Sequence, residues 1–241
     1  MTDMNKFLLS IFLNIIFLFF GWSQRAWSQQ KNPNKLQLCS KDLRSNPIVN
    51  EKHERLHECW GKYTAIKNSK YKNSIYEGEF VNGKFDGLGT YYFRDGSRGD
   101  WYVGNFREGR IEGIGTYHFS NGDKYIGSFL NGKKTGYGIL HYKNSGQYSG
   151  EWLNDQFHGT GKLTFPLGEV YEGDFAYGLR NGEGVFSFLD GSSFSGKFIS
   201  DERYGKGVEI SSDGTRFDGY WLGNKREGIS SLTDPSSNIQ Y

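Results

Sequence analysis

Proline and methionine are scarce in this chain, which contains four and two of them among 241 residues. It also lacks an excess of charge of either sign, since 29 basic and 27 acidic residues are interspersed and the formal net charge is +2. Such a balance creates no strong field to attract nucleic acid or an anionic membrane. The sequence therefore predicts no nucleic-acid partner.

Glycine and aromatic residues are abundant by contrast, with 34 glycines and 17% aromatic residues. The glycine content is about twice the roughly 7% of ordinary chains. Disordered chains can also be rich in glycine, but they lack aromatic rings, which supply the burial that offsets chain entropy. The combination predicts a folded body of short strands joined by many tight turns.

One long apolar run is present, and it lies at the N-terminus. From Phe7 to Gly21 the chain reads FLLSIFLNIIFLFFG, with Lys6 directly before it. This length is typical of the apolar part of a signal peptide and is shorter than the roughly 20 residues that span a bilayer. Ala26 and Ser28 place small residues at the two positions that a signal peptidase recognises. We therefore expect a signal peptide, residues 1–28, cleaved after Ser28, and export to the periplasm or cell envelope.

An uncleaved membrane anchor is the alternative for this segment. Trp22 and Trp27 would suit a membrane interface, and Arg25 could flank it. No cysteine follows the apolar run directly, which argues against a lipoprotein.

Residues 29–75 form a polar segment that we expect to tether or cap the folded body, and its stretch NEKHERLHECW has the spacing of one short helix. Export would place the chain's two cysteines, Cys39 and Cys59, in an oxidising compartment, so we expect a disulfide between them. A bond closing a loop of this size stabilises by about 3 kcal/mol. A metal site with His53 and His57 is the alternative, and the irregular spacing of these ligands makes it a poor one.

A repeated aromatic-x-Gly-x-aromatic element occupies residues 76–230 and leaves a tail at 231–241. Each interval between repeats is 23 residues except the first, which is 26 with its surplus in the turn near residues 96–101. Period two indicates a strand, with both rings and the intervening glycine on one face. The repeats begin at Tyr76, Tyr102, Tyr125, Tyr148, Tyr171, Phe194 and Phe217.

The two rings of each element predict an aromatic stripe along the array. The rings can pack on one another, or they can bind a protein, a sugar ring or a lipid head group, because tyrosine and tryptophan combine a flat apolar area with a polar group. We take the rings of the first five repeats as the candidate binding stripe: Tyr76, Phe80, Tyr102, Phe106, Tyr125, Phe129, Tyr148, Trp152, Tyr171 and Phe175.

A turn and a return strand complete each unit. Pairs such as Asn82-Gly83 and Asn131-Gly132 tolerate positive φ and mark a reversal of the chain. The return strand opens with Gly-x-Gly and continues with alternating bulky residues. Each unit is therefore predicted to be one β-hairpin. The fold class is all-β, an elongated single-layer antiparallel meander.

The unit resembles the MORN repeat, the membrane occupation and recognition nexus family. The segment 125–129, YIGSF, with Asn131-Gly132, Gly136 and Gly138 matches its pattern closely. The resemblance covers six units from Tyr76 to Arg216 and a truncated seventh to about Gly228, and a half unit at 59–63, CWGKY, can precede them. We expect the following departures to weaken the last two units as ligand sites without weakening their structure: Asp155, Asp201 and Asn224 in place of the turn glycine, Phe194 and Phe217 in place of the leading tyrosine, and a displaced Gly146.

Few residues suggest chemistry. His118 and His141 occupy equivalent positions in successive units, and Glu79, Glu151 and Asp174 share one column of the first strand. Both columns accept varied residues, which is typical of a solvated strand face. The recurring Gly-x-Gly lies on strands and is not a phosphate-binding loop opening a helix. We expect no enzyme activity, no cofactor and no metal.

The resemblance implies a scaffold or binding module, and the leading hypothesis is a non-catalytic protein of the cell envelope that binds a protein partner or forms a homodimer. Peripheral binding to phospholipid is the alternative. An enzyme acting on a glycan along the aromatic stripe is a third hypothesis, and it would need a carboxylate pair.

Overall fold

The computed structural model describes residues 37–38, 59–65, 73–94 and 99–233. The chain divides into two units, Met1–Leu38 and Cys39–Tyr241. The first contributes one described strand, β1 (Gln37–Leu38). The expected signal peptide and its cleavage site, Cys39, and most of the stretch expected as a helix lie outside the described residues. The described ranges hold no helix that is long and apolar enough to cross a membrane.

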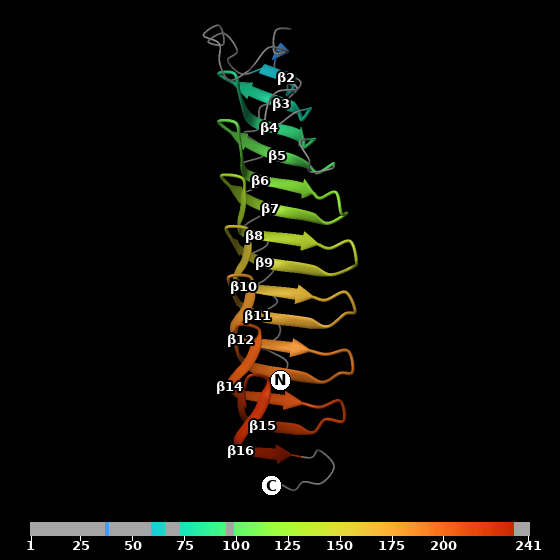
Figure 1. Ribbon diagram of the computed structural model, residues 1–241, viewed down its shortest axis with the longest axis vertical. Coiled ribbons are helices and arrows are strands. Elements are labelled where there is room, and N and C mark those ends of the chain that lie inside the picture. Colours follow the sequence, from blue (N-terminus) through green and yellow to red (C-terminus); the bar gives the residue numbers. More distant parts are fainter. Residues whose placement is uncertain (1–36, 39–58, 66–72, 95–98, 234–241) are drawn as a thin grey trace, which may run out of the picture. The chain divides into compact units, whose positions relative to one another are not determined.

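The second unit is a ladder of antiparallel strands that follow one another in sequence order (Figure 1). Its strands are β2 (Cys59–Thr64), β3 (Ile75–Val81), β4 (Lys84–Tyr92), β5 (Trp101–Arg107), β6 (Arg110–His118), β7 (Lys124–Leu130), β8 (Lys133–His141), β9 (Gln147–Leu153), β10 (Gln156–Thr164), β11 (Val170–Ala176), β12 (Leu179–Ser187), β13 (Ser193–Ile199), β14 (Glu202–Ile210), β15 (Arg216–Leu222) and β16 (Lys225–Thr233). The all-β hairpin array expected from the sequence is confirmed.

The predicted half unit before the first repeat is also present. Strand β2 pairs with β3 in the register of a return strand, with Cys59 opposite Phe80, Gly61 opposite Gly78 and Tyr63 opposite Tyr76. Cys59 and Trp60 were the last residues of the stretch whose spacing suggested a short helix. They belong instead to β2, because pairing with β3 fixes an extended backbone that local spacing alone does not reveal.

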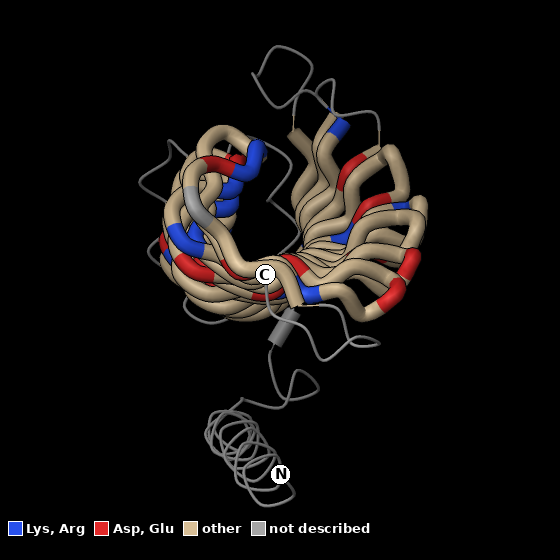
Figure 2. The backbone as a smooth tube through the Cα atoms, turned by 90° about the horizontal axis from the view of Figure 1, so that it is seen from below, with Lys and Arg blue, Asp and Glu red and all other residues tan. Residues whose placement is uncertain are grey.

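Each hairpin is bent, so that the sheet curls into a trough when seen along its long axis (Figure 2). Gly150 and Gly161 face each other on β9 and β10, and their missing side chains leave room for the ring of Tyr148. A Cβ atom on Gly150 would lie 2.5 Å from the Cα of Gly161 and 2.6 Å from the Tyr148 hydroxyl oxygen. Only glycine allows the two strands and the tyrosine ring to approach this closely.

The leading tyrosine fills the inside of the bend and links neighbouring units. The Tyr148 ring packs edge-on against Trp152 of its own unit at 5.3 Å and against Phe175 of the next unit at 5.2 Å, between ring centroids. Its hydroxyl donates a 2.8 Å hydrogen bond to the backbone carbonyl of Glu151. The ring contacts recur in the other units, and the hydrogen bond recurs in those that begin with tyrosine. The core is therefore a continuous row of interlocked rings.

Candidate functional site on the concave face

The candidate binding stripe is the core of the array. Its ten residues are only 0–5% exposed, because the curl of the sheet closes around their rings. The structure brings these residues together in one row, as expected, but it leaves their rings no area with which to contact a partner. The accessible concave surface is made by a second layer of side chains, which sequence reasoning did not single out.

This second layer comes from the return strands. Phe80 pairs with Phe85 and Tyr76 pairs with Tyr91 across β3 and β4, so these positions share the face of the core rings. The apolar side chains at these positions of the return strands are half-buried and pack on the core rings. We call the following side chains the groove wall: Phe85, Tyr91, Phe93, Ile111, Tyr117, Phe119, Leu140, Phe157, Leu163, Phe165, Phe186 and Phe188. The wall follows the concave face from β4 to β12 and on to Phe188.

Four basic residues interrupt this wall at the position that Phe85 occupies in the first unit. They are Lys134, Arg180, Arg203 and Arg226, and each lies over core rings. The guanidinium carbon of Arg203 is 4.8 Å from the centroid of the Phe194 ring, and that of Arg226 is 4.2 Å from the Phe217 ring. The Lys134 ammonium is 5.3 Å from the Trp152 ring. Stacking on a ring face holds each cation in place.

Three of the four basic residues are matched to the unusual turns of the following units. Asp155, Asp201 and Asn224 stand where the family pattern has glycine, and all three adopt positive φ. Their side-chain oxygens accept the backbone N–H groups of Lys134, Arg180 and Arg203 at 2.9–3.0 Å. The carboxylate of Asp155 also pairs with the side chain of Lys134, and that of Asp201 pairs with the side chain of Arg180.

The kind of residue in the turn correlates with the kind of residue in the groove in the other units as well, and this correlation can be read from the sequence. The turn N–H donates to the carbonyl of the residue 21 or 24 positions earlier in both kinds of turn, from Gly109, Gly132 and Gly178 as well as from Asp155, Asp201 and Asn224. Opposite the glycine turns the groove residue is Phe85, Ile111 or Phe157, and no basic residue stands there. A turn Asp or Asn therefore goes with a basic groove residue 21 residues earlier. These turn residues help to hold three of the four cationic positions of the groove.

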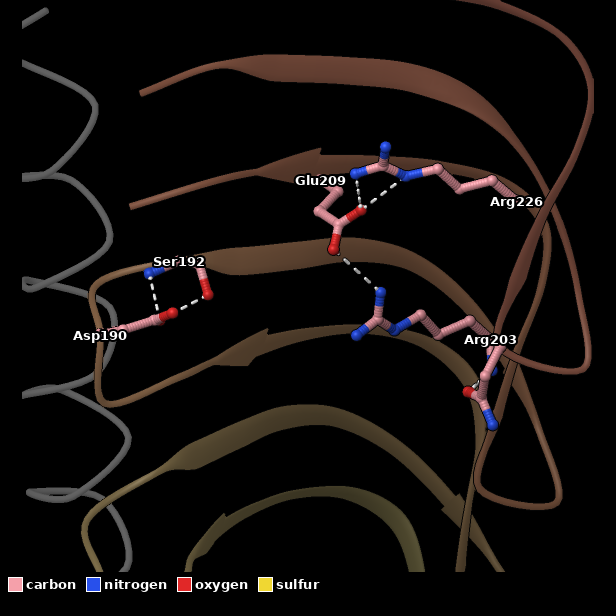
Figure 3. Close-up of polar contacts among 6 residues, drawn as sticks. Asp190, Ser192, Arg203, Glu209 and Arg226 are labelled. Atoms are coloured by element: carbon pink, nitrogen blue, oxygen red, sulfur yellow. Dashed lines mark hydrogen bonds and ion pairs between the residues drawn. The ribbon is translucent and has the colours of Figure 1, made fainter. Parts of the chain in front are cut away.

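Glu209 is the polar exception in the column that contains Tyr91, Leu163 and Phe186 in other units. It lies between two arginines (Figure 3): Arg226 donates to its Oε2 from Nε at 3.0 Å and from Nη2 at 2.6 Å, and Arg203 donates to its Oε1 from Nη1 at 3.3 Å. The concave face thus changes from a mainly apolar wall over β4–β12, interrupted by Lys134, to a polar end over β12–β16.

The candidate histidines do not form a pair. The His118 ring stacks on Trp101 with centroids 3.6 Å apart, and Lys124 stands between the two histidines, opposite His118 on one side and His141 on the other. Burial first, and then the charge of Lys124, lower the pKa of His118. Within the described ranges, no three His, Cys, Asp or Glu side chains gather closely enough to hold a metal ion.

The candidate carboxylates of the first strand cap a bulge in the sheet. Glu151 accepts the backbone N–H and the hydroxyl of Thr160, both at 3.1 Å, and Asp174 accepts the backbone N–H of Glu183 at 2.9 Å. The ladder register shifts beside these residues, which frees the N–H groups that they bind. Their role is structural, and they lie on the convex face.

Asp190 makes a similar local contact in a turn (Figure 3). Its carboxylate accepts hydrogen bonds from the backbone N–H and the hydroxyl of Ser192, and these bonds lower the pKa of Asp190.

Cys59 is buried and disulfide-bonded. The expected partner, Cys39, lies outside the described residues, so the Cys39–Cys59 pairing stays a prediction.

Six segments of the chain match the MORN repeat family, at residues 76–98, 102–124, 125–147, 148–168, 171–193 and 194–216. Together they make up more than half of the chain. The chain belongs to the MORN-repeat family. The hairpin of β15 and β16 continues the array beyond the last matched segment of the MORN repeats.

No curated protein matches the chain closely. Among solved structures, the array is similar to the TCP domain of SAS-4 (dCPAP) from Drosophila melanogaster, in complex with a proline-rich motif of Ana2 (dSTIL), at 14% identity and a TM-score of 0.33 over 66% of this chain and 86% of that one. A second similar structure is the TCP10 domain of Danio rerio CPAP with a STIL peptide, at 14% identity and a TM-score of 0.26 over 73% and 90%.

Proposed function

We propose that this MORN array is a non-catalytic scaffold that holds a segment of a protein partner along its concave face. The observation that carries the proposal is the groove wall, whose half-buried apolar and aromatic side chains recur on successive return strands and lie in line. A concave apolar surface contacts an elongated ligand from several sides at once, which a flat or convex face does not do.

The dimensions of the wall suit a peptide segment. Nine strands, β4 to β12, at about 4.8 Å spacing give a length of roughly 40 Å. An extended segment of about 12 residues, or a helix of about 25, covers that distance. Aromatic side chains are also the residues that contribute most to binding energy at protein interfaces.

A charge placed in the wall should abolish binding. We expect Leu163→Glu to remove captured partners from an affinity experiment with an extract of the source organism, because a carboxylate would have to be desolvated against the apolar segment. Glu209 occupies the equivalent position in another unit, where Arg203 and Arg226 bind it. The residues that correspond to these arginines near Leu163 are Phe157 and Arg180, so circular dichroism and urea unfolding must verify that the variant is folded.

Leu153→Glu is the matched control, since Leu153 is on the neighbouring strand but on the convex face, 44% exposed. Partners that survive Leu163→Glu, or that are lost equally with both variants, would place binding elsewhere. Light scattering of the same proteins tests whether the bound segment comes from a second copy of this chain. A dimer that dissociates in the Leu163→Glu variant would mean that it does. Sedimentation with phospholipid vesicles that is insensitive to Leu163→Glu would support lipid binding instead.

We also propose that the protein is exported, on the strength of the apolar run from Phe7 to Gly21 and the small residues Ala26 and Ser28. Expression of the full chain in a bacterium, followed by fractionation and intact mass measurement, should give a periplasmic protein that begins at Gln29. Its mass should show the Cys39–Cys59 bond before reduction. A membrane-bound product that keeps Met1 would indicate an uncleaved anchor, and a cytoplasmic one would exclude export.

A further inference from the structure

We propose that the polar end of the groove, where Arg203 and Arg226 lie in one row with Arg180, binds the carboxylates of an acidic stretch in the partner segment, and that Arg203 and Arg226 supply the charge. The inference rests on the proposed function and adds the chemistry and direction of the bound segment. The apolar part of the segment would lie over β4–β12, and its acidic part would lie over β12–β16.

The three arginines form a regular row. They occupy one column of β12, β14 and β16, so that successive residues are two strands, or about 10 Å, apart. An extended peptide covers this distance in about three residues. Each guanidinium is stacked on core rings, and a pre-ordered cation loses little side-chain entropy when it binds a carboxylate.

Glu209 shows that this row accepts a carboxylate. It replaces an apolar wall residue and receives hydrogen bonds from Arg203 and Arg226 together. One carboxylate shared by two guanidinium groups leaves a net positive charge at this end, while Asp201 balances Arg180. Arg203 gives only its Nη1 to Glu209, and a guanidinium has five N–H donors. The row therefore retains charge and donors for a further carboxylate.

The neighbouring apolar wall favours a peptide over other anions. Phe186 and Phe188 lie beside the row, with the guanidinium carbon of Arg180 5.3 Å from the first ring and that of Arg203 5.5 Å from the second. A ligand must therefore satisfy apolar and cationic positions within a few ångströms of each other. A peptide with an acidic stretch next to an apolar one does so, because one chain then supplies both kinds of side chain where the wall meets the row.

The test is selection of random twelve-residue peptides, displayed on phage, against the full chain. Selected peptides should be enriched in Asp and Glu over Asn and Gln, next to apolar residues. The same selection against the neutral triple variant Arg203→Gln, Glu209→Gln, Arg226→Gln should lose this enrichment. Lys206→Gln, on β14 but on the opposite face, should keep it. Removing both arginine charges together with the charge of Glu209 avoids leaving an unpaired carboxylate in the groove. Urea unfolding of the triple variant verifies its fold.

A single variant separates binding from a structural role. Glu209→Gln frees two guanidinium groups, so the affinity of a selected acidic peptide should rise by about 3- to 10-fold, and the triple variant should weaken it by about tenfold or more. If Glu209→Gln leaves affinity unchanged or lowers it, the proposal fails. Selected peptides that lack acidic residues but are lost with Leu163→Glu would overturn this inference while supporting the proposed function. Peptides lost with neither variant would contradict both.

Discussion

Replacing Gly150 by alanine should unfold the middle of the array. The added Cβ atom would lie 2.5 Å from the Cα of Gly161 and 2.7 Å from the carbonyl oxygen of Thr160. Both atoms belong to the backbone of the paired strand and cannot rotate away. The Tyr148 ring, 2.6 Å from the same Cβ at its hydroxyl, is held between Trp152 and Phe175.

We expect Gly150→Ala to lower the free energy of unfolding by about 3–5 kcal/mol, the range of severe steric disruption in a core. Because each repeat is stabilised by its neighbours, separating β9 from β10 should also split the array into two halves that unfold at different urea concentrations. Circular dichroism during urea titration measures both effects.

Gly178→Ala is the matched control for this change. Gly178 has a φ of 84°, and a Cβ atom there would meet nothing within 4 Å, so only backbone strain of about 1 kcal/mol is expected. A Gly150→Ala protein as stable as Gly178→Ala would show that the paired glycines are not what allows the bend.

Alkaline solution should unfold the array cooperatively above pH 10. Five leading tyrosines, Tyr76, Tyr102, Tyr125, Tyr148 and Tyr171, are fully buried. Burial is the main cause that raises the pKa of each above the usual 10.0, to about 12 for Tyr171. A raised pKa in the folded state means that the stability contributed by these groups is complete below pH 10 and is lost as the pH rises through the folded pKa.

The size of the effect follows from the number of protons. Above pH 10 the unfolded chain releases protons that the folded chain keeps, and each such proton costs about 1.4 kcal/mol of stability per pH unit. Five tyrosines give up to about 7 kcal/mol per pH unit, against a total stability of roughly 5–15 kcal/mol for a typical domain. Unfolding should therefore be complete within about two pH units above 10.

Tyrosinate absorbance and circular dichroism, recorded together from pH 8 to 12.5, test this expectation. The late part of the absorbance change should coincide with loss of the strand signal. The double variant Tyr148→Phe, Tyr171→Phe should unfold over a broader pH range, since it keeps three of the five protons; Phe194 and Phe217 already fill this position in the chain. Ionisation of all tyrosines near pH 10 with an unchanged dichroism spectrum would contradict the burial argument.

Much of the fold could be predicted because its signals are local. The spacing of Tyr148, Gly150 and Trp152 fixes a strand and its face, and the turn residues fix the reversal. The half unit at β2 was visible for the same reason, since Gly61 and Tyr63 repeat the pattern of a return strand. The short helix expected for the stretch that ends in Cys59 and Trp60 was wrong at those two residues, where pairing with β3 prevails.

The candidate site could be predicted only in part. Sequence placed the aromatic rings on one face, but their use depends on how sharply the sheet curls, a property of strand packing that no single repeat reveals. The cationic positions could have been predicted from the sequence, because a turn residue such as Asp201 accompanies a basic residue such as Arg180 in the preceding unit. That correlation becomes meaningful only when the register sets the two residues side by side.

The sequence by itself determined the repeat, the hairpins and the residues that face inward, because side-chain alternation and turn chemistry act over a few residues. Only the tertiary structure decided that the tyrosine stripe is sealed in the core and that Phe157, Leu163 and Arg203 line the accessible groove. The physical reason is the curl: paired glycines let each hairpin close over its own rings, and the next layer of side chains then meets the solvent.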